Sequence, residues 1–384
     1  MSPAASVRLV TGVLALGLAL AAPALARVPA PQQAKEAKEA KEAREAKEDE
    51  VVLKDKTTEK GKVIAENYDT LELEVKKGVK KKLEWGRIDK VVYGSTPPEY
   101  AEATADRASD PEGALEKLKE LSAKEGLSDV IRQQVLFDIA SLQQQLGALD
   151  EAVAAWNALI AAFPEGRYLG SAARGLVDCS LAKSDAEGAG KALDALKAGP
   201  AVGKFEALGV EVKALGGRIL MAQGKFADAR AAFEAAEKDP KATPNVAAFS
   251  RLGAAECLKA EGKADDAEKR FKAIVEGEGP SFLLAGAWNG LGDLLSEKGK
   301  TARNADLITE ALFAYLRGVV QYVPAPGEPQ DEFERALGGS AKCFKLLSQL
   351  ETNKDRKTYY DGQANATAER LRKLAPNSEY LKQL

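Results

Sequence analysis

Residues 224–240 read Gly-Lys-Phe-Ala-Asp-Ala-Arg-Ala-Ala-Phe-Glu-Ala-Ala-Glu-Lys-Asp-Pro, and this stretch decides the fold because recognisable copies of it recur along the chain. Residues three and four apart lie on one face of an α-helix. Ala229, Phe233 and Ala236 therefore form a narrow apolar stripe that a neighbouring helix can approach closely. Gly224 predicts the end of a preceding helix, and Pro240 follows the end of this one. The stretch predicts the second helix of a helical hairpin.

Four further copies of the stripe lie before and after this stretch. They are Ala152, Trp156 and Leu159 behind Gly147; Ala189, Leu193 and Leu196 behind Ser184; Ala267, Phe271 and Ile274 behind Gly262; and Ala311, Tyr315 and Gly318 behind a hinge at Gly299. The first alanines of the five stripes are 37, 40, 38 and 44 residues apart. Such a period predicts a solenoid of stacked helical hairpins.

A second stripe precedes each hinge, as in Trp288, Leu291, Gly292 and Leu295. Together the two stripes resemble the tetratricopeptide-repeat family, whose pattern is Trp, Leu-Gly and Tyr in the first helix and Ala, Phe, Ala and Pro in the second. The resemblance covers roughly residues 110–376 and departs from the family in its longer period. It implies a mainly α fold, with a solenoid of about six hairpins over residues 110–384.

The first 50 residues predict export followed by a spacer. Residues 1–26 carry one positive charge, Arg8, then an uncharged Leu- and Ala-rich run that ends in Ala24-Leu25-Ala26, which is typical of a secretory signal peptide. We expect cleavage after Ala26 and a periplasmic or secreted bacterial protein with no membrane anchor left; an uncleaved anchor is the alternative. Residues 27–50 are rich in Ala, Lys and Glu and predict a semi-rigid spacer, with a partner-binding helix as the alternative.

Between residues 51 and 93 the apolar period changes to two, which predicts five short β-strands. Five strands in so few residues suit a small β-barrel of SH3-like or Sm-like type over 51–94. Ser95-Thr96-Pro97-Pro98 then predicts a linker over 95–109. The segment 60–63 resembles the first Sm motif, but the second motif would need Arg-Gly where this chain has Gly86-Arg87, so no nucleic-acid partner is expected.

One predicted β-hairpin carries five lysines, at positions 76, 77, 80, 81 and 82. A basic hairpin can bind an anionic wall polymer such as peptidoglycan or polysaccharide. Exposed lysines on a strand also protect a sheet edge from aggregation. Both interpretations remain open at the level of sequence.

Several kinds of chemistry are excluded by composition. The chain has no His, so a His-based triad or His metal site is impossible. Gly299-Lys300-Thr301 resembles the end of a phosphate-binding loop, but Leu294 stands where that motif requires Gly. The three cysteines are sparse and predict buried thiols. We expect no enzyme, no cofactor and no metal.

The tetratricopeptide-repeat resemblance implies a concave groove, lined by the first helix of each hairpin, that binds peptides. Carried over by position, the groove residues are Gln134, Phe137, Ser141 and Gln144; Arg174 and Asp178; Arg218 and Met221; Glu256 and Lys259; Asn289 and Asp293; and Lys342 and Lys345. Arg174, Arg218 and Asn289 suit the carboxylates and carbonyls of a peptide. The sequence therefore predicts a non-catalytic exported adaptor that binds protein partners in the cell envelope, with an envelope-polymer-binding module as the alternative.

Overall fold

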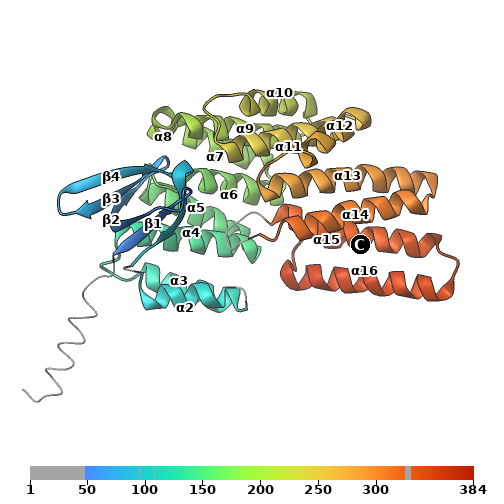
Figure 1. Ribbon diagram of the computed structural model, residues 1–384, viewed down its shortest axis with the longest axis horizontal. Helices are drawn as coiled ribbons and strands as arrows, with labels where there is room; N and C mark the ends of the chain where they lie inside the picture. The colour runs from blue at the N-terminus through green and yellow to red at the C-terminus, as the bar shows by residue number, and fades with distance from the viewer. Residues whose placement is uncertain (1–47, 95, 108, 325–329) are drawn as a thin grey trace, which may run out of the picture. The chain divides into compact units, whose positions relative to one another are not determined.

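The computed structural model describes residues 48–94, 96–107, 109–324 and 330–384. The predicted signal peptide, nearly all of the predicted spacer and most of the Pro-rich segment 324–329 lie outside these residues. Glu48–Leu384 form one compact unit, in which an antiparallel sheet is followed by helical hairpins (Figure 1). None of the helices in the described ranges is both long enough and apolar enough to cross a membrane.

The sheet has five strands in the order β4-β3-β2-β1-β5. They are β1 (Asp49–Leu53), β2 (Thr58–Glu66), β3 (Thr70–Lys76), β4 (Val79–Glu84) and β5 (Ile88–Val92). The predicted five strands are confirmed, but the predicted closed barrel is wrong, because within the described residues no ladder joins the edge strands β4 and β5. Three consecutive exposed lysines, 80–82, cover the edge strand β4 and keep it solvated.

The sheet packs on the helical part of the unit. Its core of Val51, Leu71, Leu73 and Leu83 includes Val130 of α4 (Asp129–Gln145). The guanidinium of Arg167 lies 4.0 Å from the centroid of the Trp85 ring and donates to the Tyr93 hydroxyl over 3.0 Å. The Tyr68 hydroxyl donates to Glu211 over 2.9 Å. Apolar and polar contacts together therefore fix the sheet against the solenoid.

Helices make up most of the described residues after the sheet and pack in consecutive pairs. They are α2 (Pro98–Asp106), α3 (Pro111–Ser122), α4, α5 (Leu149–Ala162), α6 (Leu169–Ala182), α7 (Ala186–Ala198), α8 (Pro200–Lys204), α9 (Glu206–Ala222), α10 (Phe226–Glu237), α11 (Pro244–Ala260), α12 (Ala264–Val275), α13 (Ser281–Ala302), α14 (Ala305–Gln321), α15 (Asp331–Leu350) and α16 (Lys354–Leu374), before a short 3-10 turn (Glu379–Gln383). Six hairpins follow α3, so the predicted tetratricopeptide-repeat-like solenoid is confirmed.

Helix α2 occupies most of the predicted linker 95–109. It packs on α3, so α2 and α3 form a helical pair before the six hairpins. Pro97 and Pro98, which predict a break in the sequence, instead begin the helix. Pro98 is the first helical residue, where a backbone N–H would have no partner within the helix, so the N–H that proline lacks is not missed. Ala103 of α2 is fully buried in the cluster around Leu118 of α3 and Val135 of α4.

The apolar stripes form the contacts between hairpins, as the spacing predicts. The first alanine of each of the five stripes is completely buried. The stripe aromatics lie against glycines of the following hairpin: a Cβ added to Gly253 would lie 2.7 Å from Phe233, and one added to Gly290 would lie 2.3 Å from Phe271. Gly224 and Gly262 form the hinges with φ of +74° and +76°, which a residue with a Cβ rarely adopts. Small residues thus let successive hairpins nest.

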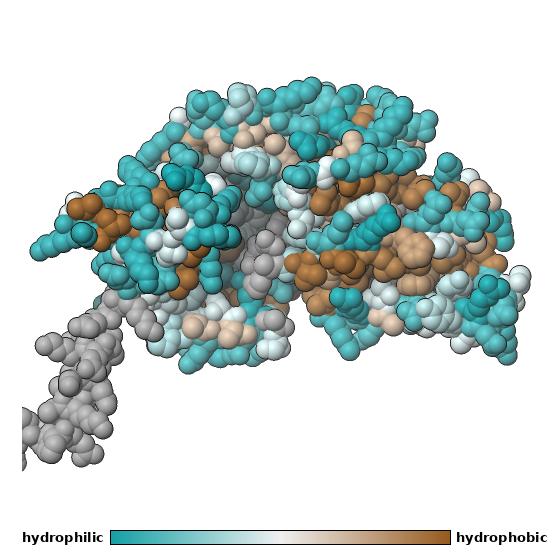
Figure 2. All heavy atoms as spheres, in the orientation of Figure 1, coloured by the Kyte–Doolittle hydropathy of each residue, from teal (hydrophilic) through white to brown (hydrophobic). Residues whose placement is uncertain are grey.

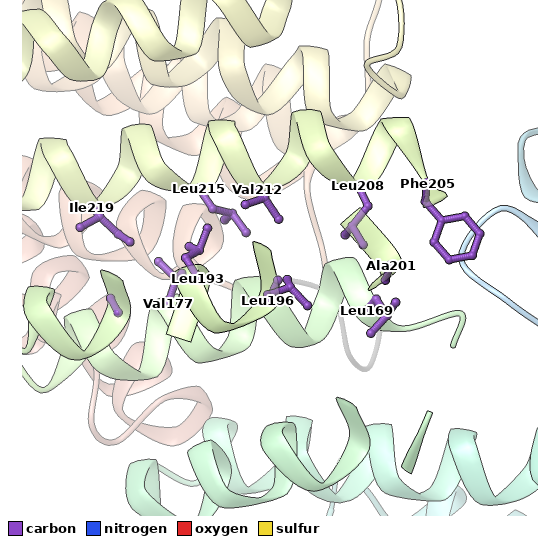
Figure 3. Close-up of a cluster of buried hydrophobic side chains, with 12 residues drawn as sticks. Leu169, Val177, Leu193, Leu196, Ala201, Phe205, Leu208, Val212, Leu215 and Ile219 are labelled. Atoms are coloured by element: carbon purple, nitrogen blue, oxygen red, sulfur yellow. The ribbon is translucent and has the colours of Figure 1, made fainter. Parts of the chain in front are cut away.

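Two departures from a regular period have visible causes. The extra helix α8 lies between α7 and α9, and its Ala201 joins the cluster that includes Leu196 and Leu208 (Figure 3). Helix α13 continues through Gly299 to Ala302, so the hinge predicted at Gly299 lies instead at Arg303, in the left-handed region with φ of +50°. Gly299 is buried inside α13, which also removes the phosphate-loop reading. The three cysteines are buried and free, as predicted.

Candidate functional site

Four of the predicted groove residues, Glu256, Lys259, Asn289 and Asp293, lie in a charged cluster formed by α11, α13 and α15. One carboxylate oxygen of Asp293 is 2.6 Å from the Lys259 ammonium and 2.5 Å from the Arg335 guanidinium. The Tyr315 hydroxyl donates to the other oxygen over 2.5 Å. Burial alone would raise the pKa of Asp293, but Arg335 and Lys259 hold this pKa well below its usual range. The carboxylate is therefore ionised and already neutralised by its own chain.

Asn289 is fully buried, so it does not present its amide to a ligand. Its side-chain nitrogen donates to the backbone carbonyl of Glu332 over 2.7 Å and to the Glu332 carboxylate over 2.9 Å. Glu332 also lies 3.5 Å from Arg335. Asn289 thus fastens α13 to the start of α15.

Arg174 and Arg218 each bind acidic residues of other helices. Arg174 donates to Glu211 of α9 over 3.2 Å. Arg218 lies 3.1 Å from Asp178 of α6 and 3.3 Å from Asp331 of α15. The arginines expected to hold a peptide therefore join hairpins of the solenoid.

Several other predicted residues contact neighbouring parts of the chain. Phe137 stacks on Tyr168 with ring centroids 4.3 Å apart, and Gln134 accepts a hydrogen bond from the Tyr168 hydroxyl. Lys342 lines a cavity of about 250 Å³, whereas the exposed Lys345 donates to the Leu384 carbonyl. The structure therefore brings Glu256, Lys259, Asp293 and Lys342 around one cavity, with Asn289 joined to them through Glu332 and Arg335. It pairs Asp178 with Arg218 and leaves Gln134, Phe137 and Lys345 apart from this cluster. Their role in binding stays a prediction.

A second apolar face on α14 was not predicted from the sequence. Ala311, Tyr315 and Gly318 face the solenoid core, as predicted. On the other side of the same helix, Phe313 is 58% exposed and Val320 is 80% exposed. A helix that is apolar on two faces buries both when its partner is present. The second face of α14 has no cover within the described chain.

The second face of α14 borders a cavity of about 1720 Å³. Its apolar side chains come from α12, α13 and α14 and include Val275, Trp288, Leu291, Leu294, Phe313 and Val320. Three predicted groove residues, Lys259, Asp293 and Lys342, also line it. We call this surface the α14 groove. Hydrophobic side chains gather over α13 and α14 on the face shown in Figure 2. The guanidinium of Arg317 lies 4.4 Å from the centroid of the Trp288 ring, and both residues belong to the lining.

The rim of the α14 groove is charged, with more acidic than basic side chains. Glu268 and Lys272 of α12 form an ion pair. Four acidic side chains of the lining have no ion-pair partner among the described residues; they are Asp265, Glu276, Glu297 and Glu310. The hydrogen bond that Lys272 donates to Glu268 raises the pKa of Lys272, and the charges of Glu276 and Glu310 raise it further. Carboxylates of α12 and α14 therefore lie close enough to the same ammonium group to influence its pKa.

A signal for this groove does exist in the sequence. Phe313, Leu316 and Val320 are three and four residues apart, so they share a helix face distinct from that of Ala311 and Tyr315. The repeat pattern explains why Ala311 and Tyr315 recur in type along the repeats, since they face the solenoid core. It does not explain why Phe313, Leu316 and Val320 are apolar. Repeat position predicts Glu256, Lys259 and Asp293 on one groove, but Arg335, which pairs with Glu256 and Asp293, gave no such signal because its partners come from other hairpins.

The lysine-rich hairpin of β3 and β4 is partly neutralised by its own sheet. Lys80 lies 3.5 Å from Glu72, and Lys81 forms an ion pair with Glu59 at 2.5 Å. These pairs and the exposure of β4 are explained by protection of a sheet edge. The hairpin gives no further support to a polymer-binding module.

Residues 220–280 match the family model for the tetratricopeptide repeat. This segment therefore resembles the tetratricopeptide repeat in sequence. It runs from the end of α9 to the loop before α13, so it includes the α12 wall of the α14 groove. Over this segment the resemblance predicted from the stripes is confirmed.

Several solved structures resemble the chain at low sequence identity. A tetratricopeptide repeat protein from Parabacteroides merdae shares 16% identity, with a TM-score of 0.40, over 75% of this chain and 97% of that one. PilW, a type IV pilus biogenesis factor, shares 15% identity, with a TM-score of 0.38, over 67% and 99% of the two chains. Pseudomonas aeruginosa PilF shares 13%, with a TM-score of 0.35, over 65% and 95%. No curated protein matches the sequence.

Proposed function

We propose that the chain is an exported, non-catalytic adaptor of the cell envelope that binds a protein partner in the α14 groove. The observation that carries this proposal is the uncovered second apolar face of α14, where Phe313 and Val320 are largely exposed. The tetratricopeptide-repeat segment supports it, since repeats of this family bind proteins. Export is supported by the signal-peptide pattern of residues 1–26.

The make-up of the α14 groove favours a protein partner. Binding hot spots consist of aromatic or aliphatic anchors in a desolvated centre, surrounded by a polar rim. Trp288, Leu291 and Phe313 provide such anchors, and the charged ends of α12 and α14 provide the rim. Covering apolar surface contributes about 25 cal/mol per Å². A partner that covers Phe313 and Val320 therefore binds with a favourable free energy, because it removes their apolar surface from water.

A non-catalytic role is supported by the state of the charged residues. The acid, base and hydroxyl groups around Asp293 bind one another, and Asp293 itself is held ionised by Lys259 and Arg335. A general acid or base needs a pKa near the working pH and access to a substrate. The cluster instead joins α11, α13 and α15.

The proposal is tested by photo-crosslinking in native cells. A benzoylphenylalanine residue replaces Phe313 in one variant and Tyr359 of α16 in a matched control, since both side chains are exposed to a similar degree, 58% and 59%. We expect a discrete protein adduct from position 313 that is absent from position 359. The adduct should disappear when Val320→Asp is added. Equal adducts at both positions, or none at 313, would overturn the proposal.

A further inference from the structure

We infer that the occupant of the α14 groove is an amphipathic helix of a protein partner, with Lys or Arg side chains beside its apolar stripe. This inference rests on the function proposed above and adds the chemistry of the partner. It is argued from the walls, the size and the charge of the groove.

The walls favour a helix over an extended peptide. Helices α11 to α15 line the groove, with Gln383 of the C-terminal 3-10 turn, and the interior backbone groups of these helices are already hydrogen-bonded. A strand laid in the groove would find no backbone partner for its own N–H and C=O groups. A helix satisfies these groups internally and needs only side-chain contacts, as in other helix-in-groove complexes.

The size of the groove favours a protein segment over a small molecule. Its volume of about 1720 Å³ exceeds the roughly 300–1,000 Å³ of a typical small-molecule site. Phe313 and Val320 are seven residues apart on α14, which is about 10 Å along the helix axis. Two turns of a partner helix cover the same length and repeat their apolar face at the same interval.

The charge of the rim favours a basic partner. Of the basic side chains of the lining, Lys259 and Lys272 are paired with acids, Arg317 lies on Trp288, and Lys298 and Lys342 have no ion-pair partner among the described residues. On α12 and α14 the lining acids outnumber the lining bases, since Asp265, Glu268, Glu276 and Glu310 stand against Lys272 and Arg317. Asp265, Glu276 and Glu310 carry no ion pair within the described residues and stand on the two helices that border the groove. Lysines or arginines flanking the partner's stripe would meet these carboxylates as the apolar faces close. An acidic helix would meet like charges on both borders.

Two fluorescein-labelled synthetic peptides provide the test. Both are about 18 residues long, or five helical turns, with the same leucine stripe; one carries lysine and the other glutamate at all remaining positions. Fluorescence anisotropy is titrated with the full chain at low and moderate salt. We expect the lysine peptide to bind at least about tenfold more tightly, which corresponds to about 1.4 kcal/mol.

Variants place this binding in the groove. Glu276→Lys/Glu310→Lys should weaken the lysine peptide about tenfold and strengthen the glutamate peptide. The matched control Asp355→Lys/Asp361→Lys makes the same change of charge on exposed positions of α16 and should alter neither affinity by more than about twofold. Val320→Asp should weaken both peptides. All five substituted positions are exposed, so we expect each variant to fold. Circular dichroism checks this.

The outcomes separate this inference from the proposed function. Equal affinity for both peptides, with sensitivity to Val320→Asp, would overturn the basic partner and keep the groove as a docking site. Peptide affinities that do not respond to Val320→Asp would overturn both. Sedimentation tests the remaining occupant: a wild-type dimer that becomes monomeric with Val320→Asp would assign the groove to a second copy of this chain and overturn the inference.

Discussion

Arg218 of α9 and Asp331 of α15 form an ion pair with 3.3 Å between nitrogen and oxygen, although 113 residues separate them in the chain. The same guanidinium lies 3.1 Å from Asp178 of α6. One arginine thereby links three hairpins. The same pattern occurs at Arg335, which lies near acids of α11 and α13. Charged side chains expected to face a ligand are used instead to fix hairpins relative to one another.

Arg218→Gln should lower the free energy of unfolding by about 1–3 kcal/mol, since two charge-assisted contacts are lost and the largely buried Asp178 is left with a neighbouring acid. Urea denaturation measures the change. Lys213→Gln is the matched control, because it removes the same charge from an exposed position of the same helix. Equal midpoints for the two variants would contradict the structural role of Arg218.

Asp178→Asn should change the pH dependence of stability. Burial raises the pKa of Asp178 to about 6; Arg218 opposes this shift and Asp331 adds to it. The folded state therefore binds more protons than the unfolded state between about pH 4 and pH 6, and the free energy of unfolding falls as the pH rises through this window. The variant lacks this contribution, so its stability should decline less across the same window. Urea titrations at several pH values measure it, with Asp361→Asn as control; parallel curves for wild type and Asp178→Asn would refute the effect.

Two glycine substitutions should change the stability of the protein in opposite directions. Gly290→Ala would place a Cβ 2.3 Å from the Phe271 ring, so it should destabilise the protein by about 1–3 kcal/mol through overpacking. Gly216→Ala in α9 meets no atom within 4 Å, so it should stabilise the protein by about 0.5–1 kcal/mol through helix propensity. Thermal unfolding reports both changes. Stabilisation by Gly290→Ala would show that α12 and α13 do not nest as described.

Arg167→Lys should loosen the sheet from the helices. The planar guanidinium stacks on Trp85 and reaches the Tyr93 hydroxyl, and an ammonium cannot reproduce this geometry. We expect a loss of about 1 kcal/mol and faster proteolysis within residues 48–94. Arg132→Lys on α4 is the control, since Arg132 has no ion-pair partner among the described residues. Equal proteolysis rates would mean that the apolar core around Val130 holds the sheet without Arg167.

Much of the fold was predictable because its signals are local. The stripe of Ala229, Phe233 and Ala236 repeats at helical spacing, and the glycine hinges at 224 and 262 mark where helices end. Period-two alternation likewise predicts the strands. Helix α2 escaped prediction because its Pro97-Pro98 start resembles a break, and the shifted hinge escaped because Gly299 lies inside a lengthened helix.

The candidate site was less predictable, for a physical reason that Asn289 illustrates. Its position in the repeat predicts the face of α13 on which it lies, but α15 comes to cover that face and buries it against Glu332. Position in a repeat specifies direction from one helix axis. It does not specify which later hairpin comes to lie in that direction.

The sequence by itself determined the helical hairpins, all but one of their hinges, the five strands and the apolar stripes, because each depends on residues a few positions apart. The tertiary structure decided which polar side chains bind one another, whether the sheet closes, and which apolar face is left uncovered. These outcomes depend on how hairpins stack across distances such as that between Arg218 and Asp331. Ion pairs and uncovered faces are properties of several helices together, and periodicity within one helix carries no record of them.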